Sequence, residues 1–270
     1  MTGVAFLERS IRGFAQALSR SLSAEQRAQK RGLLQAMDPR VRLAGVLLLV
    51  LAVTVARKLS VIRILFLTAT AIALASRVRL SVLCTRVWLV VLGFTGFIAA
   101  PAVFVTPGKA AGHLGRLVLT EQGLHTAALL VVRVEAAVTL TTALVLCTPW
   151  THILKALRSL RVPAEAVGML ALTHRYIFLL IETASQMFES RQSRILGELS
   201  GQEQRRLATR TVGVLLSRSV DLSVEVYQAM QSRGFGGEIR LLTEFRMKRL
   251  DRIFLTGFLV AALAAVWAGR

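Results

Sequence analysis

Residues 167–181 have the sequence VGMLALTHRYIFLLI, and whether this stretch crosses a membrane decides the fold. A membrane-spanning helix needs about 20 residues, and about 17 can suffice. This stretch has only 15 apolar-rich residues, with His174 and Arg175 in its middle. A central arginine costs about 2.5–3.5 kcal/mol on a scale derived from membrane insertion. We therefore predict that residues 167–181 form a helix outside the bilayer.

Five other apolar runs give the chain its hydrophobic composition. They cover residues 41–56, 60–76, 87–105, 125–147 and 253–269. The chain is 54% hydrophobic and has a mean hydropathy of +0.58, which is unusual for a soluble domain. These runs predict an all-α membrane protein with about five transmembrane helices.

Basic residues set the expected orientation of these runs. The chain has 270 residues, with 34 Lys and Arg against 15 Asp and Glu, and a net charge of +19. Lys and Arg accumulate on the cytoplasmic side of membrane proteins. If residues 167–181 crossed the membrane, the arginine-rich stretch 182–252 would lie outside the cell. We therefore expect the N-terminus and residues 148–252 to lie in the cytoplasm.

The orientation divides the chain into four predicted regions. These are an N-terminal amphipathic basic segment (1–37), a four-helix transmembrane region (38–147), a cytoplasmic region with long amphipathic helices (148–252) and a C-terminal transmembrane helix (253–270).

A short signature occurs twice in the cytoplasmic region. QMFESRQSR begins at Gln186 and QAMQSRGFGGE begins at Gln228, and each contains Gln, three residues and then Ser-Arg. The two arginines, Arg191 and Arg233, are 42 positions apart. One interpretation is helix-end electrostatics, worth a few tenths to about 1 kcal/mol. The other is a docking device, because the planar arginine fork binds carboxylates with two hydrogen bonds.

Both signatures fall near the ends of long predicted helices. The first helix is expected from Pro163 to about Leu196, because proline suits the first turn of a helix. The second is expected from about Glu203 to Ser232, with apolar residues at helical spacing. GFGG, residues 234–237, is a strong helix stop.

With these signatures, the chain resembles the transmembrane T component of energy-coupling factor (ECF) transporters, the CbiQ/EcfT family. The resemblance extends from about Asp38 to the end. Three further blocks match the family in order: DPRVRL at 38–43, TEQGLHTAALLVVRVEAAVTLTTALVLCTP at 120–149 and HILKALRSLRVP at 152–163. The two long helices resemble its coupling helices, each of which ends in an Ala-Arg-Gly type motif.

The resemblance assigns a docking role to the two signatures. The residues expected to dock cytoplasmic ATPases are Ser190, Arg191, Ser232, Arg233 and Gly234. The second motif differs from the family pattern only by serine for alanine. The first has Gln192 where glycine is usual, which bears on the geometry of the helix end.

The family's T component is not an enzyme and needs no cofactor of its own. It joins a substrate-binding membrane subunit (S or M type) to two cytoplasmic P-loop ATPases in the bacterial cytoplasmic (inner) membrane. The only Gly-Lys here, Gly108-Lys109, lacks both the preceding glycine and the following Ser or Thr of a P-loop. This agrees with ATP being bound elsewhere.

The matching blocks are closer to the CbiQ branch, which serves cobalt or nickel uptake, than to the vitamin branch. We therefore expect cobalt or nickel transport, with biotin or another vitamin as the alternative. The four histidines show no metal-ligand spacing on one helix face, so no metal site is expected in this chain.

Arg133 and Glu135 are ionisable residues within the fourth apolar run, and such residues are functional candidates in membrane proteins. They are two positions apart and point to different faces of a helix. We expect each to contact another helix or a partner subunit; a proton path is the alternative.

Three other function classes fit the sequence less well. A membrane-bound enzyme acting on phosphorylated lipids needs clustered acid–base or metal-binding residues, and none is evident. A stand-alone channel or secondary transporter is expected to show repeated halves or polar residues at mid-membrane. Nucleic-acid binding is disfavoured because aromatic residues are only 6% and no binding motif occurs.

Overall fold

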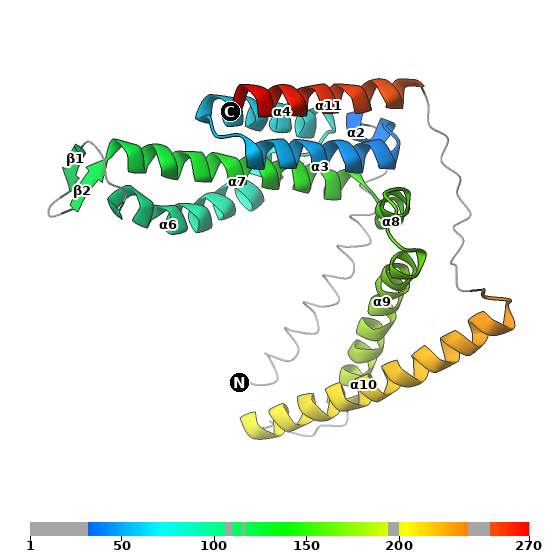
Figure 1. Cartoon of the computed structure of the whole chain (residues 1–270). Coiled ribbons are helices and arrows are strands. Elements are labelled where there is room, and N and C mark those ends of the chain that lie inside the picture. Colours follow the sequence, from blue (N-terminus) through cyan, green and yellow to red (C-terminus); the bar gives the residue numbers. More distant parts are fainter. Residues whose placement is uncertain (1–31, 106–109, 115–116, 194–199, 237–248, 270) are drawn as a thin grey trace. The chain divides into compact units, whose positions relative to one another are not determined.

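The computed structural model describes residues 32–105, 110–114, 117–193, 200–236 and 249–269 (Figure 1). Most of the predicted N-terminal amphipathic segment lies outside these residues. The elements in chain order are α2 (Leu33–Ala36), α3 (Pro39–Val55), α4 (Leu59–Ala75), α5 (Leu80–Val82), the π-helical turn η1 (Leu83–Trp88), α6 (Leu89–Val105), β1 (Ala110–Leu114), β2 (Leu117–Thr120), α7 (Glu121–Cys147), α8 (Trp150–Ser159), α9 (Ala164–Gln192), α10 (Gly201–Ser232) and α11 (Arg249–Gly269). The predicted helical fold class is confirmed.

The chain divides into two compact units. The first, called the membrane unit, comprises residues 26–156 and 243–270. The second, called the α9–α10 unit, contains residues 157–242. The four predicted regions remain predictions, because their boundaries also depend on where the bilayer lies.

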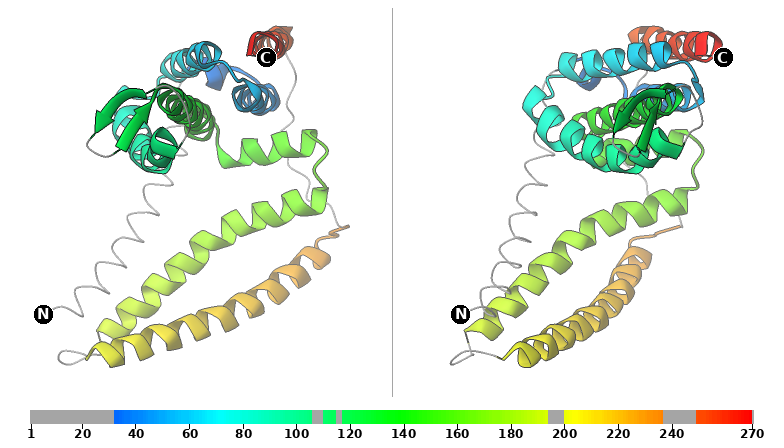
Figure 2. Two further views of the ribbon diagram at one scale, coloured as in Figure 1. Left: turned by 60° about the vertical axis from the view of Figure 1, so that its left-hand side comes forward. Right: turned by 90° about the vertical axis from the view of Figure 1, so that its left-hand side faces the viewer.

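Helix α7 is the centre of the membrane unit. It packs against α3, α4 and α6, and α11 packs against α3 (Figures 1 and 2). A cluster of buried apolar residues joins α4 and α7 to α2 and η1. Its members are Leu34, Met37, Ala73, Leu83, Val87, Ala143 and Cys147.

Local sequence sets where α3 and α7 begin. Asp38 is the N-cap of α3, and its Oδ1 accepts a hydrogen bond from the Arg40 backbone N at 2.9 Å. Pro39 fills the first helical position, where its missing N–H costs nothing. Thr120 caps α7 in the same way through the Gly123 N at 3.3 Å. A cap of this kind contributes about 1 kcal/mol.

A two-stranded antiparallel hairpin connects α6 to α7. β1 pairs with β2, with Leu114 opposite Leu117 next to the turn. The Thr120 side chain also donates to the Val103 carbonyl at 3.1 Å, which ties the end of α6 to the start of α7. The sequence, rich in glycine here, predicts only a loop in this segment.

Within the described residues, four helical segments are long and apolar enough to cross a membrane, judged by length and composition alone. Three of these segments, Leu80–Val103, Glu121–Cys147 and Arg249–Gly269, contain or overlap predicted spans. The fourth is Ala164–Met187, in α9, which contains the stretch predicted to stay outside the bilayer. α3 and α4 have 17 residues each, about 26 Å at 1.5 Å per residue, which is near the lower limit for a span.

The α9–α10 unit consists of two long helices joined by a short connection. The 29 residues of α9 begin directly after Pro163, as the sequence predicts. The 32 residues of α10 begin with a capping box, in which the Ser200 side chain accepts from the Glu203 N and the Glu203 side chain accepts from the Ser200 N. Both helices therefore form close to the predicted bounds.

Candidate functional site: two arginine-bearing helix ends

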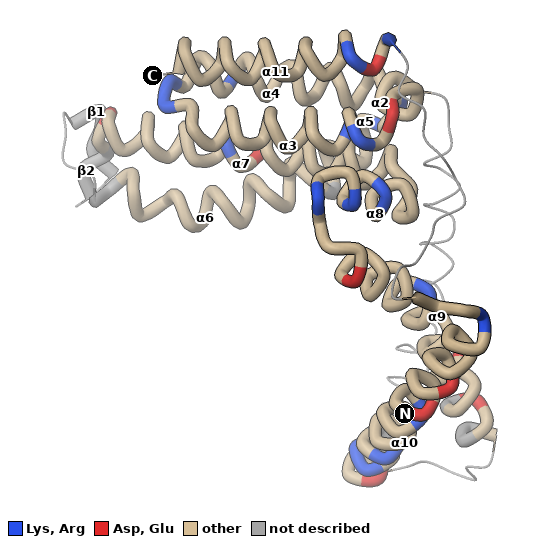
Figure 3. The backbone as a smooth tube through the Cα atoms, turned by 45° about the vertical axis from the view of Figure 1, so that its right-hand side comes forward, with Lys and Arg blue, Asp and Glu red and all other residues tan. Residues whose placement is uncertain are grey.

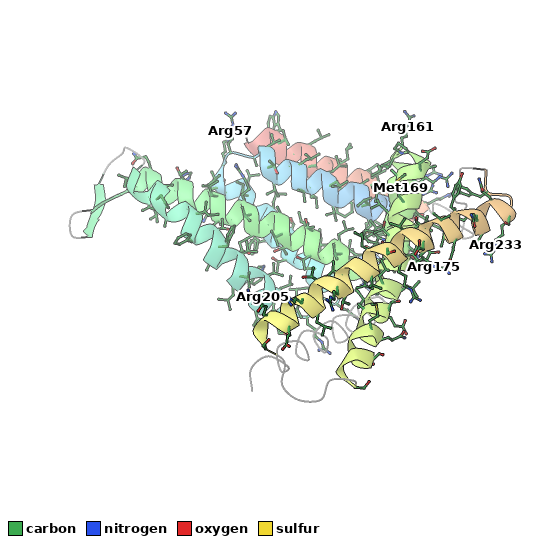
Figure 4. The ribbon with its side chains drawn as sticks, turned by 90° about the horizontal axis from the view of Figure 1, so that it is seen from below. Arg57, Arg161, Met169, Arg175, Arg205 and Arg233 are labelled. Atoms are coloured by element: carbon green, nitrogen blue, oxygen red, sulfur yellow. The ribbon has the colours of Figure 1, made fainter. Side chains whose placement is uncertain are left out.

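The second signature ends α10 in a Schellman motif, a turn in which two backbone bonds close the helix. The Gly234 N donates to the Gln231 carbonyl at 2.9 Å, and the Phe235 N donates to the Met230 carbonyl at 3.0 Å. Arg233 is the C-cap residue, with φ −93° and ψ 10°, and its side chain is exposed. Figure 4 shows Arg233 at this end of α10 and Arg205 near the other end. The turn thus holds an arginine in solvent at a fixed place.

Gly234 makes this turn possible. Its φ is +78°, in the left-handed region that favours glycine, and a Cβ there would meet nothing within 4 Å. Backbone conformation, and not space, therefore selects glycine. Ser232 adds a local bond, because its Oγ donates to the Gln228 carbonyl at 2.9 Å. The motif's serine and glutamine are thus linked through the helix backbone.

The first signature does not end α9 in the same way. Ser190 is exposed, and Arg191 and Gln192 are both helical, although only their backbones lie within the described structure. The Ser193 N donates to the Glu189 carbonyl at 3.1 Å, which is the ordinary helical pattern. The helix therefore continues past Arg191, consistent with glutamine in place of glycine at position 192.

An apolar cavity of about 540 Å³ lies between α9 and α10. Tyr176 lines it from α9, Leu222 and Val226 line it from α10, and Met230 and Phe235 line it from the Schellman turn. Phe235, whose backbone N closes the turn after Arg233, is therefore also part of the apolar lining of the cavity.

A further apolar surface of α10 faces solvent. It is a stripe at intervals of three or four residues, called the α10 stripe: Val212, Leu216, Val220, Val224 and Tyr227, each more than half exposed. Contiguous exposed apolar surface of this kind marks an interaction site with protein or lipid.

Arg133 contacts the end of another helix. Its Nη2 donates to the carbonyl of Ala56, the C-cap residue of α3, at 2.6 Å. Glu135 differs, because its side chain is only 5% exposed and neither carboxylate oxygen has a hydrogen-bond partner among the described residues. The two residues are thus not brought together. Figure 3 marks basic and acidic positions in the middle of α7, whereas α6 contains no Lys, Arg, Asp or Glu.

Arg42 is a buried polar residue whose role the sequence does not reveal. It is 2% exposed, and its guanidinium donates to the Cys147 carbonyl at 2.8 Å, to the Thr148 Oγ1 at 2.9 Å and to the Met37 carbonyl at 2.9 Å. An arginine in the first turn of a short apolar helix can equally well extend to the interface. The Arg42 side chain is directed into the protein because the end of α7 supplies its acceptors there.

The start of α8 lies in the same basic neighbourhood. Burial, together with the positive charges of Arg42 and Lys155, lowers the pKa of His152. Burial and Arg40 likewise lower the pKa of Lys155. The α7–α8 corner is therefore a place where several cations are held close together.

Among the described residues, no group of three His, Cys, Asp or Glu side chains could hold a metal ion. Cys84 and Cys147 are free thiols. The structure thus offers no candidate ligand set within its described part.

Comparison with known proteins gives a family match over most of the chain. The sequence model of the CbiQ family, described as cobalt transport protein, matches residues 30–244. This range includes both signatures and ends before α11. An uncharacterized protein of Methanocaldococcus jannaschii is 27% identical over 253 residues, covering 92% of this chain and 87% of that protein.

A second relative is the cobalt transport protein CbiQ of Rhodobacter capsulatus. It is 33% identical over 125 residues, which cover 46% of this chain and 51% of the relative. The aligned part is therefore about half of each chain.

Proposed function

This chain belongs to the CbiQ family of cobalt transport proteins, and we propose that it is the transmembrane coupling (T) subunit of an ECF-type importer. In this role it joins two cytoplasmic P-loop ATPases to a separate substrate-binding membrane subunit. It transmits the motion driven by ATP and hydrolyses nothing itself.

The observation that carries the proposal is the geometry of the second signature. Arg233 is exposed at the end of a 32-residue helix, on a turn fixed by two backbone bonds. A guanidinium held in this way can bind a carboxylate with two hydrogen bonds at little cost in ordering. Arg191 repeats the residue at the end of α9. Two arginines on two helix ends match a requirement for two ATPase subunits.

The exposed apolar surface supports the other half of the role. The α10 stripe is unsuited to solvent and is available for an apolar partner. We propose that this partner is the substrate-binding subunit. The family description favours cobalt as the transported ion, with nickel as the chemically similar second candidate.

The test is co-purification of the tagged chain with candidate ATPases encoded by its source organism. We expect the wild-type chain to retain the ATPases and the Arg191→Ala/Arg233→Ala variant to lose them. Arg205→Ala is the matched control, because Arg205 is an exposed arginine near the opposite end of α10 from Arg233 (Figure 4). Loss of binding in the control, or retention in the double variant, contradicts docking through these two residues.

Uptake by the assembled complex distinguishes the substrates. Vesicles containing all subunits should accumulate cobalt or nickel in an ATP-dependent way. Accumulation of biotin or another vitamin instead would keep the coupling role and change the substrate branch. ATP hydrolysis by the purified chain alone would contradict the non-enzymatic role.

The proposed role also requires both signatures to lie on the cytoplasmic side of a bacterial inner membrane. α9 is long and apolar enough to cross, so its location needs a direct test. Single cysteines are introduced at Ser193 and Gly236, both of which are exposed. In vesicles with the outer face of the membrane outward, we expect them to react with a membrane-impermeant thiol reagent only after the vesicles are permeabilised, which exposes the cytoplasmic side. The background for this test is a chain without Cys84 and Cys147. Labelling from the outer side contradicts the cytoplasmic assignment.

A further inference from the structure

Helices α3 and α7 are joined at two places by arginine side chains. Arg42, near the start of α3, donates to the carbonyl of Cys147, the last residue of α7. Arg133, within α7, donates to the carbonyl of Ala56, the C-cap residue of α3. Each helix therefore supplies an arginine to the C-terminal end of the other. The two helices must run antiparallel for this to occur, and Figure 1 shows them side by side.

The spacing of these contacts is the same in both helices. Arg42 precedes Ala56 by 14 residues, and Arg133 precedes Cys147 by 14 residues. At 1.5 Å per residue, each interval is about 21 Å along the helix axis. Equal intervals allow both bonds to form without a shift of one helix along the other. A sliding motion between α3 and α7 would therefore break both bonds together.

These bonds satisfy groups that have no partner within their own helices. The last four carbonyls of a helix lack intrahelical donors, and water is not available to them inside a bilayer. Arginine is suited to the task because it remains charged and offers five donors in a rigid fork. Arg42 uses its two terminal nitrogens, Nη1 and Nη2, for three acceptors at 2.8–2.9 Å, while its Nε has no hydrogen-bond partner among the described residues.

Arg42 also acts on the corner between α7 and α8. Its Nη1 donates to the Oγ1 of Thr148, the C-cap residue of α7, and Pro149 follows directly. The carbonyl of Pro149 accepts from the Ile153 N at 3.2 Å in the first turn of α8. Only this corner separates the end of α7 from the start of α8, so a displacement of α8 acts first on Thr148.

The start of α11 meets the same place. The Asp38 N donates to the Asp251 Oδ1 at 2.9 Å, which ties the N-cap of α3 to α11. Arg42, four residues later, joins this point to the α7–α8 corner. The beginning of α3 is therefore the point at which α7, α8 and α11 are held together.

We propose that Arg42 is the positioning residue through which movement of α8 reaches the membrane helices, with Arg133 keeping α3 and α7 in register at the far end. The inference rests on the proposed coupling function. In this mechanism, α3 and α7 move as one rigid body. The movement of α8 is transmitted to that body at the corner formed by Thr148. Without Arg42, α8 moves while the membrane helices lag behind.

The test measures ATP hydrolysis and cobalt uptake in the same vesicles, using the complete complex. We expect Arg42→Gln to leave ATP hydrolysis within about two-fold of wild type and to lower the cobalt taken up per ATP about ten-fold, within the usual range of coupling between sites. Arg133→Gln should lower the same ratio less, about three-fold, because it loosens the end away from α8. Arg63→Gln, an exposed arginine of α4, is the control and should change nothing.

Thr148→Val tests the same contact from the other side and can be measured even if Arg42→Gln does not fold. Valine has nearly the same shape and removes only the side-chain acceptor at the corner, so it should lower uptake per ATP about two- to three-fold in an assembled complex. A wild-type ratio in any folded Arg42 variant overturns the inference, as does an equal loss of hydrolysis and uptake in an assembled complex. A wild-type complex without ATP-dependent uptake refutes the proposed function itself, and the Arg42 role with it.

Discussion

The ends of α9 and α10 carry the same Ser-Arg pair but finish in different ways. α10 stops at Ser232, and Gly234 closes the chain into a left-handed turn. α9 continues through Gln192, and Ser193 still donates to the carbonyl four residues before it. The residue after the arginine, glycine in one helix and glutamine in the other, therefore determines how the helix ends. The arginine itself does not.

This difference changes how each arginine is held. Arg233 is outside the helical conformation and lies in a turn that is closed by backbone hydrogen bonds from Gly234 and Phe235. Arg191 is still in the helical conformation, in the last turn of α9. A side chain on a turn fixed by two closing bonds loses less freedom on binding than one that extends from the last turn of a helix. We expect the two docking contacts to differ in strength.

The largest expected effect comes from removing the arginines one at a time. Arg233→Ala should weaken ATPase binding by about 2 kcal/mol or more, which is typical of a central interface arginine. Arg191→Ala should cost about 1 kcal/mol, because its contact is less well organised before binding. Titration of each variant, held in lipid nanodiscs, with purified ATPase measures both values.

Arg205→Ala serves again as the control and should stay within about 0.5 kcal/mol of wild type. If Arg191→Ala weakens binding as much as Arg233→Ala, the difference between the helix ends has no functional consequence.

Gly234→Ala attacks the turn without touching the arginine. Alanine at φ +78° costs about 1–2 kcal/mol through its own backbone, and the open space around the Cβ position excludes a clash with residues elsewhere in the structure. The closing bonds from Gly234 and Phe235 should then exchange with solvent hydrogen faster, which amide exchange measures. ATPase binding should fall by a similar amount. Unchanged exchange at Phe235 would show that the turn tolerates a side chain.

The sequence predicts the helices well because apolar periodicity and terminal residues are local. Pro163 and the GFGG stretch mark helix limits that the structure reproduces closely. It also predicts that Arg133 and Glu135 face different sides, since two positions on a helix are about 200° apart. Local geometry is sufficient for all of these features.

The rest depends on which helices become neighbours. Arg42 is buried only because the end of α7 supplies acceptors for its guanidinium. The partner of Arg133, the Ala56 carbonyl, is 77 positions away in the chain, and no short pattern links them. No local signal predicts the hairpin before α7, or a Glu135 carboxylate without a hydrogen-bond partner among the described residues. The docking role of Arg191 and Arg233 therefore stays a prediction from the sequence, whereas the contacts that join the membrane helices appear only in the structure.

The start of α10 offers a smaller test, because the capping box fixes this end independently of the Schellman turn. Ser200→Ala should destabilise the first turn by about 1 kcal/mol while leaving exchange at Phe235 unchanged. Hydrogen bonds from Ser200 lower the pKa of Glu203 below its usual value of 4.5. The contribution of the box is therefore present above that pH and is lost as the pH falls through the lowered pKa. Amide exchange of the first turn at neutral and acidic pH measures this loss.

The smallest expected effect is also the one that tests the comparison most directly. Gln192→Gly gives the first signature the glycine of the second, so α9 gains the option of ending just after Arg191. Glycine near a helix end costs at most about 1 kcal/mol in helix propensity, and a left-handed closing turn offsets part of that. We expect ATPase binding to strengthen by a few tenths of a kcal/mol, within the range of preorganisation by one residue. The gain should disappear in an Arg191→Ala background, because a better helix end has no value without the arginine it holds. A gain that persists in that background would place the benefit in α9 itself and would separate helix ending from docking.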